Sequence, residues 1–304
     1  MPAASVSTRD PAIAFAPLVR LDRRETAFPA DATRLVAHAG LEWSSRRCGY
    51  DRDITPSGTL GPGAPSPLPP LVAGRLGRGQ GYRARTLPDC ETPRGPVFST
   101  VQRTRPFDTE DRPVGLPVGE GFNLDIVSAI LAGERRLDDG ALVGVPAYYA
   151  LDDAMVAGRP GIRLSYWMVF GLQLQPRGSE LASREGDWER VDVLARAGRR
   201  PGRYVPLAVE YHRGGDRARR VAWGEAELAG PGRTHPVAYL ERGMHTPRPD
   251  RTCRRCTDWR TWRNLRDVRR EPWFGYGGGW GAMGDSDEGS GPSGPSPFVL
   301  GPSP

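Results

Sequence analysis

Two carboxylates stand two residues apart at Asp187 and Glu189, just before an apolar run. In an extended chain alternate residues share a face, so both acids point the same way as Val191 and Val193, with Trp188 on the opposite face. Because an unpaired buried charge is costly, two acids on the apolar side of a strand need water, a cation or hydrogen-bond donors. A functional or metal-binding site and a structural ion pair would both meet that need.

Three of the four histidines lie close together in the sequence, at His212, His235 and His245. Imidazoles and carboxylates are the usual ligands of borderline divalent cations and the usual general acids and bases. Each histidine alone reads as a hydrogen-bonded structural residue. Taken jointly, Asp187, Glu189, His212 and His245 predict a cleft that binds a polar ligand such as a headgroup, sugar or phosphate. A divalent cation of unknown identity would be held there by Asp187, Glu189 and His212.

If the cleft is catalytic, it would most resemble metal-assisted hydrolysis, in which the cation lowers the pKa of a bound water and a His or Glu moves protons. One alternative is a noncatalytic module that meets a membrane surface or a protein partner. A third is a specialised enzyme whose reaction is unassigned, since a fold does not fix a function. The second alternative rests on a tryptophan-rich C-terminal region: Trp259, Trp262, Trp273 and Trp280.

Strand-like runs separated by Gly, Pro, Arg and Asp turns dominate the second half of the chain. The clearest is Ile162 to Leu174, in which seven apolar side chains fall on one strand face and would scatter around a helix. We therefore expect a mainly β protein, an antiparallel β-sandwich with short peripheral helices and long Gly/Pro-rich loops. The runs are Ala141 to Tyr149, Ile162 to Leu174, Trp188 to Ala195, Tyr204 to Tyr211, Arg220 to Glu225 and Pro236 to Leu240.

The first half of the chain predicts little regular structure. Ile13 to Leu35 reads as an irregular segment followed by a short helix with Asp31 as its N-cap. Asn123 to Ala132 resembles a short amphipathic helix that stops at Gly133. We expect a single domain, residues 1–304, with a flexible Gly/Pro/Ser-rich insertion at about 55–81 and a Gly/Pro-rich tail from about 275.

The charge of the chain is +6, and all 42 basic residues are Arg. Arginines are scattered, with short clusters at Arg217 to Arg220 and from Arg248 to Arg270. No nucleic-acid-binding module accompanies them, so the charge indicates a solvated surface and we expect no nucleic acid partner. The segment Met1 to Asp22 lacks the apolar region of a secretory signal, and no run is long enough for a transmembrane segment. The expectation is a soluble, cytoplasmic protein.

Four cysteines occur at Cys48, Cys90, Cys253 and Cys256. The C-x-x-C pair could form half of a structural zinc site that Cys48 and Cys90 complete. Disulfides would fit an oxidising compartment and free thiols the cytoplasm, and we favour free or partly paired cysteines over zinc.

Several blocks, in order, resemble the vacuolar protein sorting-associated protein sixty-two-like family. The resemblance covers most of the chain except Thr55 to about Leu116. It implies a β-sandwich of the interaction or sorting type. The blocks are Ala16 to Asp22 with Phe28-Pro29, Glu185 to Glu189, Val209 to His212 with Trp223, His235 to Tyr239 leading to Gly243-Met244-His245, and Pro272 to Gly281.

The block Glu185 to Glu189 also resembles the G-H-R-H-D-W-E motif of necrosis- and ethylene-inducing-like proteins. These are β-sandwich toxins that hold a divalent cation and bind sphingolipid headgroups, so the resemblance implies that Asp187 and Glu189 are cation ligands. Where both families usually place a histidine, this chain has Arg184, whose side chain stays protonated and cannot ligate a cation. Arg184 could pair with an acid or bind an anion bidentately. We expect Arg184, His235 and Trp223 to contact the polar ligand.

Overall fold

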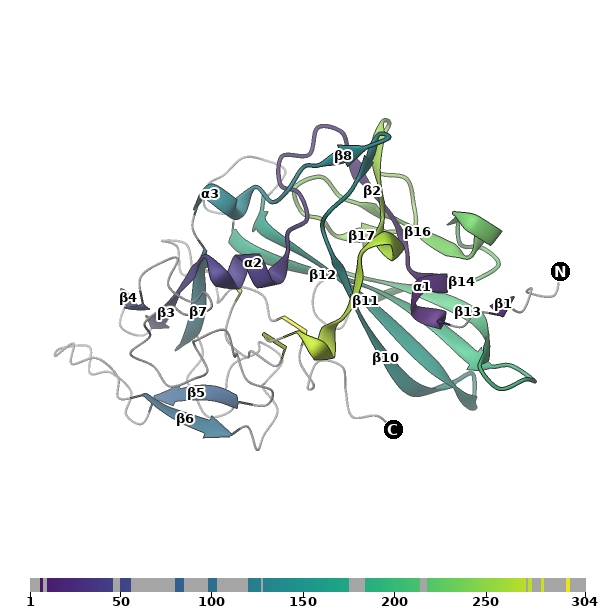
Figure 1. Cartoon of the computed structure of the whole chain (residues 1–304), viewed down its shortest axis with the longest axis horizontal. Coiled ribbons are helices and arrows are strands. Elements are labelled where there is room, and N and C mark those ends of the chain that lie inside the picture. Colours follow the sequence, from purple (N-terminus) through teal and green to yellow (C-terminus); the bar gives the residue numbers. More distant parts are fainter. Residues whose placement is uncertain are drawn as a thin grey trace.

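A seven-stranded sheet, which we call the large sheet, carries the longest strands of the protein (Figure 1). The computed structural model describes residues 6–7, 10–45, 50–55, 80–84, 98–102, 120–126, 128–174, 184–213, 218–271, 273–274, 280–281 and 294–295. All neighbours in the large sheet are antiparallel except the pair β10 and β19. Its order is β1 (Val6–Ser7), β13 (Arg203–His212), β12 (Arg184–Ala197), β11 (Arg159–Gln173), β10 (Ala147–Val156) and β19 (Leu265–Asp267), with β14 (Ala218–Ala222) also on β13.

A second seven-stranded sheet, the facing sheet, is built from shorter strands far apart in the sequence. Its order is β15 (Leu228–Ala229), β16 (His235–Leu240), β2 (Leu18–Asp22), β18 (Cys256–Arg260), β9 (Ala141–Leu142) and β8 (Leu137–Asp138), with β17 (Pro247–Arg248) also on β16. Two small sheets contain β4 (Tyr50–Thr55), β3 (Ala39–Ser45) and β7 (Glu120–Ile126), and β5 (Gln80–Ala84) with β6 (Phe98–Gln102). The helices are α1 (Pro11–Phe15), α2 (Ala32–Ala37) and α3 (Ser128–Leu131), with 3-10 turns at Pro231–Arg233, Thr261–Arg263 and Val268–Arg270.

The large sheet and the facing sheet enclose an apolar layer between them, as the sequence predicts. Leu164 and Phe170 of β11 are fully buried in it, together with Val19 of β2. Tyr211 of the large sheet reaches the facing sheet, since its Oη donates to Val237 O of β16 at 3.1 Å, and Tyr166 Oη donates to Ala12 O of α1 at 2.8 Å. Burying these rings while satisfying their hydroxyls ties the large sheet to β16 and to α1. The expected fold class, a mainly β protein with antiparallel sheets and few short helices, is confirmed.

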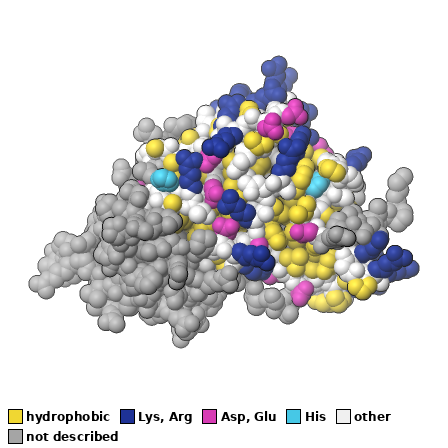
Figure 2. All heavy atoms as spheres, viewed as in Figure 1, with side chains coloured by type: hydrophobic (Ala, Val, Ile, Leu, Met, Phe, Trp, Pro, Cys, Tyr) yellow, Lys and Arg dark blue, Asp and Glu magenta, His cyan; other side chains and the backbone are white. Residues whose placement is uncertain are grey.

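The opposite face of the large sheet is covered over part of its area by an aromatic cluster. Trp188 of β12 lies edge-on to Trp280, with ring centroids 5.0 Å apart, and 5.3 Å from Trp273. Helix α2 and Tyr148 complete the cluster. Figure 2 shows arginine side chains spread among apolar and uncharged groups over the visible face, several of them next to acidic ones.

Most of the strands predicted from alternation are confirmed as β11, β12, β13, β14 and β16. The run Ala141 to Tyr149 is instead divided between two sheets, because the chain turns at Gly144, where φ is +84°. Helix α2 begins after Asp31, whose side chain accepts from Thr33 N, so the predicted N-cap is confirmed.

The helix predicted over Asn123 to Ala132 is wrong in its first half. Residues Glu120–Ile126 form β7, which pairs antiparallel with β3, and only Ser128–Leu131 is helical. Leu124 and Ile126 are buried on one face of the strand. In so short an apolar run the helix and strand periods cannot be separated, and pairing with β3 decides the outcome. The stop at Gly133 is correct, since its φ is +71°.

The reading of Ile13 to Leu35 as an irregular segment before a helix is also wrong in part, because it misses α1 and β2. Strand β2 lies between β16 and β18, and this pairing with distant segments fixes it. The insertion at about 55–81 falls mostly outside the described residues, as do Cys48 and Cys90 and most of the tail from 275. That the chain is a single domain stays a prediction.

Asp31 joins α2 to the large sheet, which gives a test of this packing. Its Oδ1 accepts from Thr33 N at 2.9 Å and from Tyr148 Oη at 3.0 Å, and its Oδ2 accepts from Arg266 at 3.1 Å. We expect Asp31→Ala to lower the free energy of unfolding by about 2 kcal/mol in urea denaturation, because the cap and the acceptor of the buried Tyr148 hydroxyl are both lost. Asp31→Asn retains an acceptor for the cap and should lose about half as much. Equal losses in the two variants would contradict the capping role.

Candidate functional site

Asp187 and Glu189 lie on the core side of the large sheet. They pair with Phe170 and Met168 of β11, whose side chains belong to the layer between the sheets. Asp187 is 1% exposed and Glu189 is 6% exposed. The alternation of β12 therefore places both acids as the sequence predicts, on the same side as Val191.

His245 contacts the first of these acids. Its Nδ1 lies 3.0 Å from Asp187 Oδ2, and its ring stacks on Phe170 with centroids 3.8 Å apart and planes 4° apart. The imidazole is fully buried. A carboxylate oxygen accepts, so this contact corresponds to the tautomer with the proton on Nδ1, which donates a hydrogen bond to Asp187. His245 also has a φ of +53°, a left-handed backbone that non-glycine residues rarely adopt.

A third buried acid, Glu25, lies on the other side of this histidine. Its Oε1 is 3.9 Å from His245 Nε2, and it accepts from Thr26 N at 2.9 Å and Ala27 N at 3.2 Å. Its Oε2 accepts from Gly243 N at 2.9 Å. Sequence reasoning missed Glu25, because an acid directly after two arginines reads as surface charge. Only the structure reveals its role, because its carboxylate accepts from backbone N–H groups of two loops.

His212 lies on the opposite face of the large sheet from Asp187 and Glu189. Its Nε2 is 3.1 Å from Asp192 Oδ2, and Asp192 pairs across the strands with Glu210. The structure therefore brings Asp187 together with His245 but does not bring His212 to either. A signal for this was present in the sequence, because His212 alternates with the core residue Tyr211 and so faces outward with Glu210.

Asp192 is the centre of the outward cluster. It is 1% exposed, and Arg190 Nε and Arg163 Nε lie 3.4 and 3.9 Å from its oxygens. Burial alone raises the pKa of Asp192, but the hydrogen bond from His212 and the positive charge of Arg190 outweigh it, so the pKa is lower than usual. The side chain of Ser165 adds a further hydrogen bond. Asp192 is thus held as a carboxylate.

Arg190 selects the tautomer of His212. Its Nη2 lies 2.8 Å from His212 Nδ1, while its guanidinium carbon lies 5.0 Å from the centre of the Trp167 ring. A guanidinium only donates, so Nδ1 is the acceptor. Nε2 then carries the proton and donates a hydrogen bond to Asp192. Two hydrogen bonds therefore link Arg190 to His212 and His212 to Asp192, and an ion pair joins Arg190 to Asp192.

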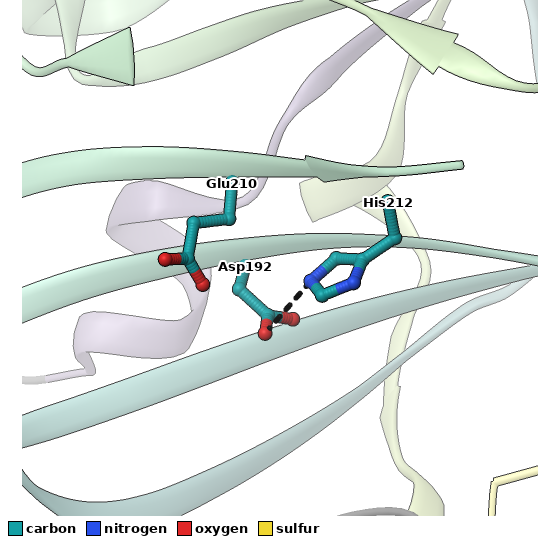
Figure 3. Close-up of side chains that lie close together, drawn as sticks. All are labelled: Asp192, Glu210 and His212. Carbon is teal, nitrogen blue, oxygen red and sulfur yellow. Dashed lines mark hydrogen bonds and ion pairs between the residues drawn. The ribbon is translucent and has the colours of Figure 1, made fainter. Parts of the chain in front are cut away.

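Asp192, Glu210 and His212 form a group that could hold a metal ion (Figure 3). One ligand atom from each lies within 4.8 Å of the other two, and Asp192 and His212 are buried while Glu210 is half-buried. Glu210 also has Arg220 Nη1 at 3.8 Å. Within the described part of the chain, this is the group whose spacing suits a metal ion.

The remaining predicted ligand contacts are dispersed. His235 is buried, its Nδ1 donates to Ala16 O at 2.7 Å, and its ring stacks on Trp262 at 3.8 Å. Burial lowers the pKa of His235, although the bond to Ala16 opposes this shift. Trp223 lies edge-on to Phe15 in the layer between the sheets. The side chain of Arg184 lies outside what the structure describes, and ligand binding by these residues stays a prediction.

The four C-terminal tryptophans, which the sequence suggested for contact with a membrane or a protein, do not form an exposed surface. Trp259, Trp273 and Trp280 are 1–2% exposed, and Trp262 is half-buried against His235. A membrane or protein contact would therefore have to use other side chains.

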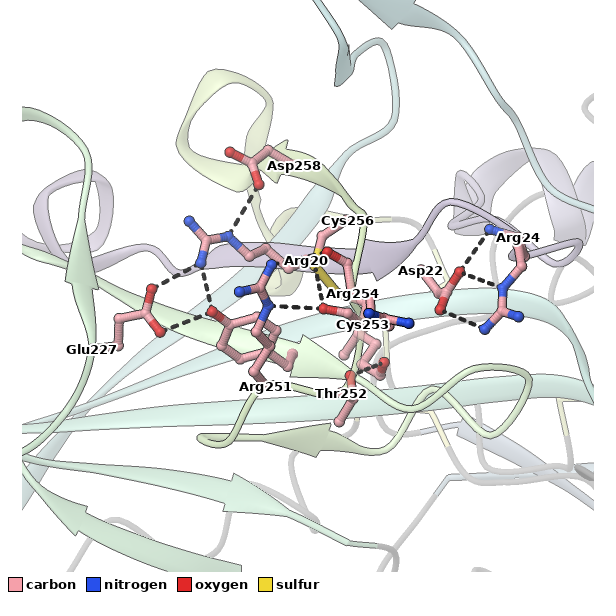
Figure 4. Close-up of a disulfide and its surroundings, with 12 residues drawn as sticks. Arg20, Asp22, Arg24, Glu227, Arg251, Thr252, Cys253, Arg254, Cys256 and Asp258 are labelled. Atoms are coloured by element: carbon pink, nitrogen blue, oxygen red, sulfur yellow. Dashed lines mark hydrogen bonds and ion pairs between the residues drawn. A yellow bond between two sulfur atoms is a disulfide. The ribbon is translucent and has the colours of Figure 1, made fainter.

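Cys253 and Cys256 form a disulfide with each other (Figure 4). They are paired, as part of our expectation allowed, and their sulfurs are not available as the thiolate ligands that zinc requires. The other two cysteines fall outside the described residues.

No protein-family model, curated protein or solved structure matches this chain. Among its described helices, none has the length and apolar character needed to cross a bilayer. The resemblances to known families stay predictions.

Glu25 offers a test of the buried cluster around His245. Glu25→Ala removes the acceptor of three backbone N–H groups, so we expect the free energy of unfolding to fall by about 3 kcal/mol or more. Glu25→Gln keeps one carbonyl acceptor and should lose less. Thermal and urea unfolding would measure both. A loss under about 0.5 kcal/mol in Glu25→Ala, which is usual for a surface position, would contradict this role.

Asp192 predicts a specific dependence of stability on pH. Its pKa is lower in the folded chain than the ordinary 3.8, so the unfolded chain takes up the proton first as pH falls. The carboxylate therefore contributes stability that is present above the unfolded pKa and is lost as pH falls through the folded pKa. In a metal-free buffer, the wild type should lose more unfolding free energy than Asp192→Asn between about pH 5 and pH 2. If the unfolding free energies of the two proteins fell in parallel over this pH range, the lowered pKa of Asp192 would be refuted.

Proposed function

We propose that this protein binds a divalent metal ion on the outward face of its large sheet, with Asp192, Glu210 and His212 as ligands. The observation that carries the proposal is the convergence of two carboxylates and one imidazole within 4.8 Å. The three residues sit on two adjacent, hydrogen-bonded strands, β12 and β13, so the sheet itself holds their spacing. Sites on regular strands are held more firmly than sites on loops.

The chemistry of the ligand set favours zinc or manganese. Carboxylate oxygen and imidazole nitrogen are ligands that both ions accept, whereas calcium and magnesium prefer oxygen alone. Three protein ligands are also the number found in catalytic zinc sites, where a further position is left for water or substrate. When bound, such an ion would lower the pKa of a water molecule, which is the chemistry of metal-assisted hydrolysis.

Arg190 competes with the ion for this group. To bind a metal through Nε2, His212 must move its proton to Nδ1, which now accepts from Arg190. Metal binding therefore requires the guanidinium to leave His212, and the ring of Trp167 already offers it a place. Repulsion between the two cations acts in the same direction. The affinity for the ion is thus lowered by Arg190.

A polar ligand of this site would carry a negative charge. Arg163 and Arg220 are exposed. Arg163 lies 3.9 Å from Asp192 and Arg220 lies 3.8 Å from Glu210, so their guanidinium groups flank the ligand set. Guanidinium groups bind carboxylate and phosphate through paired hydrogen bonds. We infer an anionic small molecule, bound by these arginines next to the ion, as the substrate class if the site is catalytic.

Metal titration of the chelator-treated protein tests the proposal. Calorimetry with zinc or manganese should show one site, and Asp192→Asn and His212→Ala should weaken binding by about 100-fold or more, since even second-shell changes cost 10 to 100-fold. Arg190→Gln should strengthen binding about tenfold, because it removes a competing positive charge. Asp258→Asn, an acid of the facing sheet, is the control and should bind like the wild type.

The same titration distinguishes the two acid groups of β12. Binding that survives in Asp192→Asn and is lost in Asp187→Asn would place the ion beside Asp187 and Glu189, the cation ligands that the family resemblance implies, and would overturn the proposal. Absence of binding in the wild type and in Arg190→Gln would overturn it as well.

A further inference from the structure

Six exposed arginines gather at one end of the facing sheet, on three loops that are distant in sequence. Figure 2 shows dark-blue side chains projecting at the top of the view, the end at which β8 and the loop after β2 lie in Figure 1. We call this surface the arginine platform. It consists of Arg23, Arg24, Arg242, Arg251, Arg254 and Arg255.

Hydrogen bonds join the three loops of the platform. The loop after β2 is joined to the loop after β16 because Glu25 Oε2 accepts from Gly243 N at 2.9 Å. It is joined to the third loop because Arg23 N donates to Arg255 O at 3.1 Å. Arginines at sequence positions more than two hundred residues apart are therefore held on one surface.

The third loop is closed by its own disulfide, Cys253 to Cys256, which encloses Arg254 and Arg255 (Figure 4). Arg251 donates from Nε to Cys253 O at 2.9 Å and from Nη2 to Arg254 O at 3.0 Å. Thr252 Oγ1 donates to Leu240 O at 2.9 Å and fastens the loop to β16. The guanidinium groups thus extend from a backbone with little freedom, which reduces the entropy lost on binding.

Positive charge exceeds negative charge on the platform. Asp22 accepts from Arg24, and this bond, assisted by the charges of Arg24 and Arg242, lowers the pKa of Asp22 although burial opposes the shift. The turn with Asp138 and Asp139 runs beside the start of β18. Glu241 and Asp250, on two of the same loops, are paired with Arg248 and Arg219, which lie outside the platform. The six arginines therefore outnumber the four other nearby acids, Asp22, Glu25, Asp138 and Asp139.

We propose that the arginine platform docks the protein on membranes that carry anionic phospholipids. Guanidinium groups bind phosphate oxygens in pairs, and a bilayer offers many phosphates in one plane to arginines that extend from three separate loops. Basic side chains near an anionic leaflet each add to the attraction. The platform lies on the facing sheet, so this docking is independent of the proposed metal site on the large sheet.

Vesicle flotation tests the proposal with the full chain. We expect binding to phosphatidylcholine vesicles that contain phosphatidylserine, weak binding to pure phosphatidylcholine, and a decline as salt is added. The double variant Arg254→Gln/Arg255→Gln should bind about 25-fold more weakly, from roughly fivefold for each arginine. The matched control is Arg199→Gln/Arg200→Gln, which removes the same charge from the exposed turn between β12 and β13 and should bind like the wild type.

Three results would overturn the proposal. Equal losses in the two double variants would show that only net charge matters. Equal binding to neutral vesicles would exclude recognition of anionic lipid. Tighter binding to a DNA or RNA duplex than to vesicles, with the same loss in Arg254→Gln/Arg255→Gln, would make nucleic acid the partner of this surface. Asp192→Asn should float with vesicles like the wild type, so this test is separate from that of the metal site.

Discussion

The hydrogen bond between Asp187 and His245 is the constraint on which the arrangement of both layers depends. It connects β12 of the large sheet to the loop after β16 of the facing sheet. Glu25 extends the connection to the loop after β2 by accepting from Gly243 N. All three side chains are buried, where a broken polar contact costs more than it would at the surface. The facing sheet, built from short strands, is thus positioned by polar bonds in addition to its apolar layer.

Strand β12 separates two kinds of acid by alternation alone. Asp187 and Glu189 face the layer between the sheets, whereas Asp192 faces outward with Arg190. Three of these four side chains are nearly inaccessible. The outward group around Asp192 differs because the exposed side chains of Arg163 and Arg220 lie next to it and can attract an anionic ligand. A buried structural cluster therefore lies on one face of β12 and a candidate metal site on the other, which explains how the two groups lie only a few residues apart.

The sequence predicts the regular part of this fold well. Ile162 to Leu174 places seven apolar side chains on one strand face, and β11 follows this run. It also indicates that Asp187 faces the core. It fails where pairing partners decide: β7 has the short apolar run of a helix, and β2 is a strand because β16 and β18 flank it. Joining His212 to Asp187 fails for a related reason, since sequence proximity of functional residue types does not show which face of a sheet each occupies. Glu25 has no pattern that would mark it.

Gly186 has a φ of +65°, and a Cβ there would lie 1.3 Å from the carbonyl oxygen of Trp280. The contact joins β12 to a residue much further along the sequence. Tyr148, Trp188 and Trp273 pack in the same cluster. During synthesis on the ribosome, the nascent chain therefore exposes the rings of Tyr148 and Trp188 until the segment with Trp273 and Trp280 emerges. Contacts of such wide sequence separation slow the search for the native state, and a chaperone that shields aromatic surface would assist folding before that segment emerges.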